Sequence, residues 1–122
     1  MTDAEMKVRT KAFGIRIVRL FRALPHSEEA RIIGPQLLRS GTSVGANYRA
    51  VCRSRSRQEF IAKLGLVLEE TDETLFWLEM LAHCNMVAAT RLKILIRAAN
   101  ELTCIFVASL TRAKKVRELT GP

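Results

Sequence analysis

The 122-residue chain has little of what interrupts helices or builds a catalytic centre. It contains three prolines, six glycines, three cysteines, two histidines and one tryptophan. So few prolines and glycines favour long helices over a loop-rich or all-β fold. The cysteines, Cys52, Cys84 and Cys104, are odd in number, widely spaced and without a CxxC pair. They fit reduced, buried thiols in a cytoplasmic protein better than a disulfide framework or a zinc site.

The chain also lacks a long uninterrupted hydrophobic run. A charge breaks every candidate before it reaches the roughly 20 residues that span a bilayer. The first ten residues, MTDAEMKVRT, are charged and contain no apolar signal core. We therefore expect a cytoplasmic protein with no membrane partner. A chain of this length suffices for one domain around one core.

Apolar residues recur every three or four positions over four segments, and this spacing predicts helices. Pro25 ends the first segment, Gly34-Pro35 is expected to kink or restart the second, and Asn85 ends the third in a left-handed conformation. The sequence SRQE at Ser56–Glu59 fits a capping box. No alternating strand pattern is present. These features predict an all-α fold, an antiparallel up-down four-helix bundle, as a single domain over residues 1–122 with helices at about residues 4–24, 28–53, 57–84 and 88–116.

The first and fourth segments carry more apolar residues than a single core-facing stripe requires. Such wide apolar faces indicate a subunit interface, and hence a homo-oligomer. The extra residues are Ile15, Val18 and Phe21 in the first segment and Ile96, Ile105 and Leu110 in the fourth.

The stretch RSGTSVGAN, residues 39–47, has the most unusual composition in the chain. A phosphate-binding P-loop would need a preceding strand and a GK[ST] ending, and neither is present. Inside a helix, Gly41 and Gly45 each cost about 1 kcal/mol relative to alanine, so we expect a close helix crossing in compensation. Ser40 and Asn47 fall within the apolar stripe, which predicts buried polar residues that need hydrogen-bond partners. A polar ligand pocket is the alternative.

The net charge of +8 is unevenly distributed. Residues 7–57 hold twelve Lys or Arg and two acids, residues 59–82 hold six acids and one lysine, and residues 91–117 hold seven bases and one acid. A basic excess of this size favours nucleic acid or another polyanion as partner. Alternatively, the acidic segment neutralises its basic neighbours within the fold.

Two clusters of cations are candidate phosphate-binding sites, since guanidinium and ammonium groups suit phosphate contacts. Only Tyr48 interleaves with the first cluster, so base stacking is unsupported and binding should be mainly to the nucleic-acid backbone. The first cluster is Arg49, Arg53, Arg55 and Arg57, and the second is Arg112, Lys114, Lys115 and Arg117.

No constellation for catalysis is present. A carboxylate-bridged di-iron centre would need a Glu-x-x-His pair on each of two helices, and the only histidines are His26 and His83. We therefore expect no metal and no cofactor. The acids Glu69, Glu70, Asp72 and Glu73 are interpreted as a solvated or salt-bridged face.

Three segments together resemble the four-helix-bundle family that includes the 23S rRNA intervening-sequence proteins. They are QLLRSGTSVGANYRA (Gln36–Ala50), SRQEFIAKLGLVLEETDETLFWLEML (Ser56–Leu81) and ANELTCIFVASLTRAKK (Ala99–Lys115). The resemblance implies an antiparallel four-helix bundle that assembles as a homopentameric ring, with no established enzymatic activity. A related bundle, the accessory variability protein of diversity-generating retroelements, is a basic ring that engages nucleic acid and a reverse transcriptase.

One position departs from the family pattern. Many members carry an acid after the sequence ANYR, where this chain has Ala50, so any polar site that uses this acid is in doubt here. The matching Ser40, Asn47, Lys63, Glu70 and Trp77 are retained.

The sequence thus favours a non-enzymatic, homo-oligomeric scaffold that binds RNA or DNA. The alternative is an adaptor that docks an acidic protein partner, such as a reverse transcriptase or another nucleic-acid enzyme.

Overall fold

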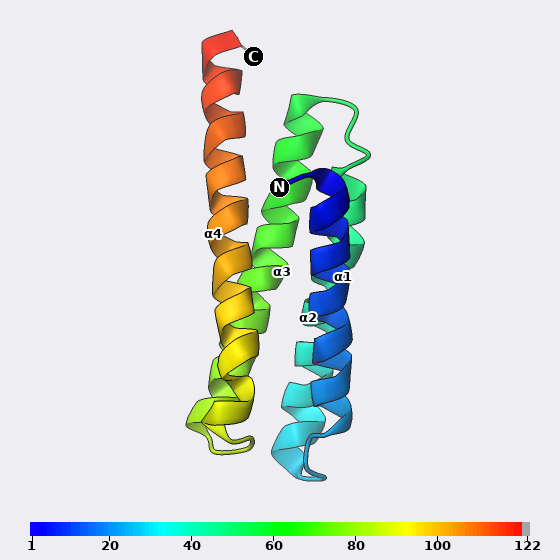
Figure 1. Ribbon diagram of the computed structural model, residues 1–122, viewed down its shortest axis with the longest axis vertical. Coiled ribbons are helices and arrows are strands. Elements are labelled where there is room, and N and C mark those ends of the chain that lie inside the picture. The colour runs from blue at the N-terminus through cyan, green and yellow to red at the C-terminus, as the bar shows by residue number, and fades with distance from the viewer. Residues whose placement is uncertain (121–122) are drawn as a thin grey trace.

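The computed structural model describes residues 1–120, and every regular element in this part of the chain is a helix. Consecutive helices run in opposite directions, as Figure 1 shows, so the predicted all-α, up-down arrangement is present. The helices are α1 (Asp3–Arg22), α2 (Glu28–Val51), α3 (Arg57–His83) and α4 (Ala89–Thr120).

Local signals start and stop the helices. Ser56 caps α3 by accepting a hydrogen bond from the Glu59 N–H at 3.1 Å. The reciprocal half of the predicted capping box is not made within the described residues, because the Glu59 carboxylate accepts from Lys63 Nζ at 2.7 Å instead. Asn85 has φ 55°, which confirms the predicted left-handed end of α3.

Of the two outcomes expected at Gly34-Pro35, a kink or a restart of the second helix, the restart does not occur, because α2 continues through Pro35. Proline removes one intrahelical hydrogen bond. Ala30, Gly34 and Leu37 are buried on either side of it, and their packing holds the backbone helical.

Packing between the helices is uneven. The pairs α1–α2, α2–α3 and α3–α4 pack along their lengths, whereas α1 and α4 contact each other only sparsely. The bundle therefore has three closed sides and one open side. The core includes the fully buried Ile17, Leu37, Leu64 and Phe106, one from each helix.

The glycines of α2 produce the close crossing that the sequence predicts. A Cβ on Gly41 would lie 2.7 Å from Ile17 Cγ2, and one on Gly45 would lie 3.2 Å from the Thr10 carbonyl. Both distances are shorter than ordinary van der Waals contact. Residues with side chains at these two positions would therefore force α1 and α2 apart.

The buried serine and threonine hydroxyls find hydrogen-bond partners within their own helices, which confirms the expectation for Ser40, whereas the prediction that Asn47 is buried is wrong. Ser40 is completely buried, but its Oγ donates to Leu37 O at 3.3 Å within its own helix. Thr10 and Thr71 likewise bond to carbonyls of their own helices. Asn47 is only half-buried, because it lies at the edge of the stripe. Each of these hydroxyls donates to a carbonyl three or four residues earlier in its own helix, so its burial does not require a hydrogen-bond partner on another helix.

Two expectations about buried residues are also corrected. Cys84 is exposed because it lies past the end of α3, Cys104 is exposed on the side of α4 that contacts α1 only sparsely, and Cys52 is partly buried. Leu110, expected on a subunit interface, is buried in the core.

Helix α4 is long and apolar enough between Ala89 and Leu119 to cross a membrane by length and composition alone, because 18 consecutive residues within it have a mean hydropathy of 1.5. The core helix of a bundle passes the same test. Only 28% of these 18 residues are buried within the chain, so α4 retains apolar surface outside the core.

Candidate nucleic-acid interface

A groove of about 680 Å³ runs between α1 and α2 and is lined by cations from three helices. Residues with small or no side chains, among them Gly14, Gly45 and Ala46, form part of its wall. The glycines that allow the helix crossing therefore also leave space in the groove. The cations are Lys7 and Lys11 from α1, Arg49 from α2, Arg53 from the turn that follows α2, and Lys63 from α3.

The cations form two rows because of their spacing. Lys7 and Lys11 are four residues apart on α1, and residues at this spacing share one face of a helix, about 6 Å apart along its axis. Arg49 lies in the last turn of α2, and Arg53 lies two residues past the end of that helix. Packing of α1 against α2 then places the two rows along the same groove.

None of the residues that line this groove is acidic. Lys63 is the member engaged by an acid, Glu59, and this contact together with Arg55 lowers the pKa of that carboxyl. Within residues 1–120, the side chains of Lys7, Lys11, Arg49 and Arg53 make no ion pair or hydrogen bond. Four charges are thus left for an external anion.

The predicted first cluster is divided by the turn between α2 and α3. Arg49 and Arg53 lie in the groove, whereas Arg55 lies in the connection, 88% exposed, with its Nε 3.6 Å from Glu59 Oε2. Arg57 begins α3 and lines a different groove. The chain reverses direction between Val51 and Arg57, so residues that are close in sequence lie on different sides of the bundle.

This second groove, of about 820 Å³, lies between the start of α1, the start of α3 and the second half of α4. Its lining includes Met6, Phe60 and Phe106, and both Arg57 and Arg112. One member of each predicted cluster therefore reaches the same groove. The exposed Lys114, Lys115 and Arg117 lie further along α4, towards its C-terminal end. Figure 1 shows that this end of the helix projects past the others.

Tyr48 is unavailable for base stacking. Its side chain is buried against Phe106, with ring centroids 6.0 Å apart, and its hydroxyl donates to Asp3 Oδ1 at 3.3 Å. Burial, with smaller contributions from Cys52 and Asp3, raises the pKa of this phenol. The ring therefore belongs to the core.

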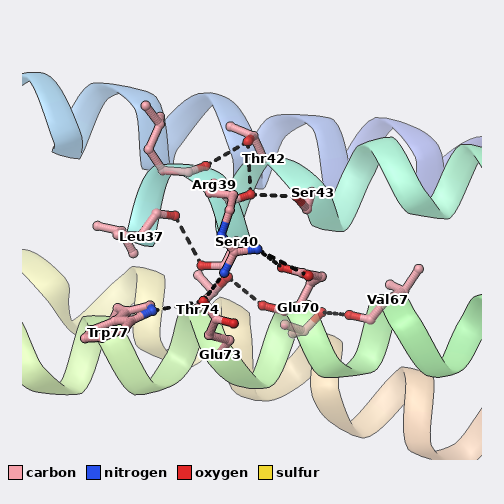
Figure 2. A network of polar contacts seen from close by, with 12 residues as sticks. Leu37, Arg39, Ser40, Thr42, Ser43, Val67, Glu70, Glu73, Thr74 and Trp77 are labelled. Atoms are coloured by element: carbon pink, nitrogen blue, oxygen red, sulfur yellow. Dashed lines mark hydrogen bonds and ion pairs between the residues drawn. The ribbon is translucent and has the colours of Figure 1, made fainter. Parts of the chain in front are cut away.

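Part of the acidic segment is neutralised within the fold (Figure 2). Arg39 pairs with Glu70 at 3.2 Å and with Glu73, whose carboxylate also accepts from Trp77 Nε1 at 3.1 Å. The hydrogen bond to Glu73 is the main cause of the raised pKa of Arg39. The interpretation of a salt-bridged face is confirmed for Glu70 and Glu73. Among the described residues, no group of three or more His, Cys, Asp or Glu side chains is placed to hold a metal ion.

Sequence reasoning missed Lys7, Lys11 and Lys63 as members of the basic groove. Their only sequence signal is the four-residue spacing of the two lysines on α1, which a solvated helix face also shows. Only the register between α1 and α2 places them beside Arg49 and Arg53.

The fold and the groove define a small four-helix bundle with a cationic groove and one open side. The chain belongs to the 23S rRNA-intervening sequence protein family, whose model matches residues 2–108. This confirms the resemblance seen in the sequence.

A solved relative supports the same assignment. A protein of unknown function from the S23 ribosomal protein family of Bacteroides thetaiotaomicron is similar to this chain, with 32% identity and a TM-score of 0.83. The match covers 91% of this chain and 99% of the relative. No functionally curated protein matches the chain.

Proposed function

We propose that this protein is a non-enzymatic, cytoplasmic, homo-oligomeric scaffold that binds RNA or DNA through phosphate contacts. The α1–α2 groove is the site on each subunit. Repetition of this groove around an assembly, such as the pentameric ring implied by the family resemblance, would increase avidity without a strong single site.

The observation that carries this proposal is the charge of the groove. Lys7 and Lys11 face Arg49 and Arg53 along one groove, and none of its lining residues is an acid. By contrast, Arg39, outside this groove, is paired with Glu70 and Glu73. Unpaired cations repel one another, so an anionic ligand that spans both rows would be stabilised there.

The ligand should be read through its backbone. Phosphate oxygens accept hydrogen bonds from guanidinium and ammonium groups whatever the base sequence. Among the aromatic residues, Tyr48 is in the core and none lines the groove. We therefore expect weak sequence preference and a steep dependence on salt concentration.

Fluorescence anisotropy with labelled, mixed-sequence RNA and DNA oligonucleotides across a KCl series tests this proposal. Arg49→Glu with Arg53→Glu should weaken binding at least tenfold at low salt. Loss of two phosphate contacts should reduce the slope of log K against log salt by about 1.5.

The matched control is Lys114→Glu with Lys115→Glu, which changes net charge equally at the projecting end of α4. We expect a smaller effect from it. Equal loss in both variants would mean that net charge and not the groove controls binding. Absence of binding by the unmodified protein at low salt would rule out the nucleic-acid function. Recovery of one stoichiometric acidic protein after nuclease treatment would instead support the adaptor alternative.

A further inference from the structure

The open side of the bundle holds a groove that the nucleic-acid site does not use. It has a volume of about 640 Å³ and lies between α1 and α4, with Ile96 and Ile105 among its lining residues. Arg9, Lys93 and Arg97 also line it. Arg9 pairs with Glu101 at 2.7 Å, whereas the side chains of Lys93 and Arg97 make no ion pair within residues 1–120. The groove is therefore apolar and positively charged.

The outward face of α3 has the opposite character. Gly65, Glu69, Asp72 and Phe76 follow one another at spacings of three and four, so they share one side of the helix. Glu69 and Asp72 are exposed and make no ion pair in the described part of the chain, and Phe76 is 53% exposed. This side of α3 thus carries two unneutralised acids followed, one turn further along the helix, by a large apolar ring.

Gly65 does not make room for a neighbouring helix of its own chain. A Cβ added there would meet nothing within 4 Å, whereas one added at Gly14, Gly34, Gly41 or Gly45 would contact a neighbouring helix. Glycine within a helix is destabilising relative to alanine. No part of the chain itself requires a glycine at position 65 for space. The glycine is explained if another polypeptide approaches α3 closely at this position.

We propose that the outward face of α3 in one copy docks in the α1–α4 groove of a second copy. Glu69 and Asp72 of the first copy would lie against Lys93 and Arg97 of the second. Phe76 would cover the apolar lining that the sparse contact between α1 and α4 leaves open. Every other helix of the chain has more basic than acidic residues. The acidic face of α3 is therefore the surface whose charge complements this basic groove.

Because the two surfaces differ, the contact is head-to-tail, and repetition of it generates a ring or an open chain of subunits. The inference rests on the self-assembly included in the proposed function. It does not depend on nucleic acid, because it uses the opposite side of α1 from the basic groove.

Sedimentation velocity of nuclease-treated protein over a concentration series tests the docking. Glu69→Lys with Asp72→Lys should weaken association at least tenfold, and so should Lys93→Glu with Arg97→Glu. The protein that carries all four substitutions should recover much of the association, because its charges are exchanged. Circular dichroism establishes that each variant is folded.

Unchanged association in either double variant would overturn the proposal. The proposal would also be overturned if both double variants lost association and the protein with all four substitutions, although still helical, did not recover it. Arg49→Glu with Arg53→Glu serves as the control, and it should lose nucleic acid while retaining the assembly. A monomeric unmodified protein at high concentration would overturn the docking alone, since binding of nucleic acid to the monomer would still be measurable.

Discussion

Helix α1 has two neighbours in the bundle, and its two sides are built differently. Towards α2, Gly41 and Gly45 leave room for Ile17 and for the backbone at Thr10, and the two helices pack along their length. Towards α4 the contact is sparse, and an apolar, basic groove lies between the helices. The salt bridge between Arg9 and Glu101 crosses this side at 2.7 Å.

The difference shows that a four-helix chain need not close every side of its bundle. Close approach towards α2 comes from glycines, whose cost in helix propensity is offset by packing. On the α4 side, Tyr48 of α2 bridges the two helices, because its ring contacts Phe106 of α4 and its hydroxyl donates to Asp3 of α1. We infer that the closed side supports stability, whereas the open side is available for association.

The largest expected effect is at Tyr48, where α1, α2 and α4 meet. Tyr48→Ala removes a buried aromatic ring and should lower the free energy of unfolding by about 3–4 kcal/mol. Tyr48→Phe removes only the hydroxyl and should cost about 1 kcal/mol. Urea unfolding followed by circular dichroism measures both. If the free energy of unfolding of Tyr48→Ala equalled that of the unmodified protein, the ring would not hold α1, α2 and α4 together.

A pair of identical substitutions tests the closed side. Gly41→Ala places a Cβ 2.7 Å from Ile17 Cγ2, and after the gain in helix propensity it should lower the free energy of unfolding by about 1–2 kcal/mol. Gly65→Ala, where an added Cβ meets nothing, should raise it by up to about 1 kcal/mol. Unfolding is measured at low protein concentration, so that association does not contribute. If both substitutions changed the free energy of unfolding in the same direction, the contrast between Gly41 and Gly65 would be contradicted.

The smallest effect at neutral pH concerns the ionisation of Tyr48. Burial raises the pKa of this phenol in the folded protein, so its contribution to stability is complete below about pH 10, the value for an unfolded chain. The contribution is lost as the pH rises through the folded pKa. Because the chain has one tyrosine, tyrosinate absorbance reports this group alone. Its midpoint should lie higher in the folded than in the denatured protein, and coincident midpoints would show that the ring is solvated.

Sequence reasoning found the helices and several of their boundaries because those signals are local. Ser56 and Asn85 act on neighbouring backbone, and apolar spacing repeats within each helix. The close crossing at Gly41 was also predictable, since glycine within a helix needs a packing reason. The continuation of α2 through Pro35 was not, because neighbouring buried residues overrode the local preference.

The basic site was predictable only in part. Arg49 and Arg53 were identified from their exposure and spacing, and the groove includes both. Lys7, Lys11 and Lys63 come from other helices, so their proximity depends on the register of packing. The burial of Ser40 was correctly predicted. The sequence did not show that its hydroxyl donates to Leu37 O within the same helix, because this depends on the side-chain geometry in the packed bundle.

The sequence by itself determined that this chain forms four amphipathic helices, a close α1–α2 crossing and an excess of basic charge. Each of these depends on residue type and on spacing along the chain. Only the tertiary structure decided that the arginines after RSGTSVGAN separate into different grooves and that the α1–α4 side stays open. The physical reason is that helix formation follows interactions a few residues apart, whereas a groove and its charge are properties of surfaces brought together by packing.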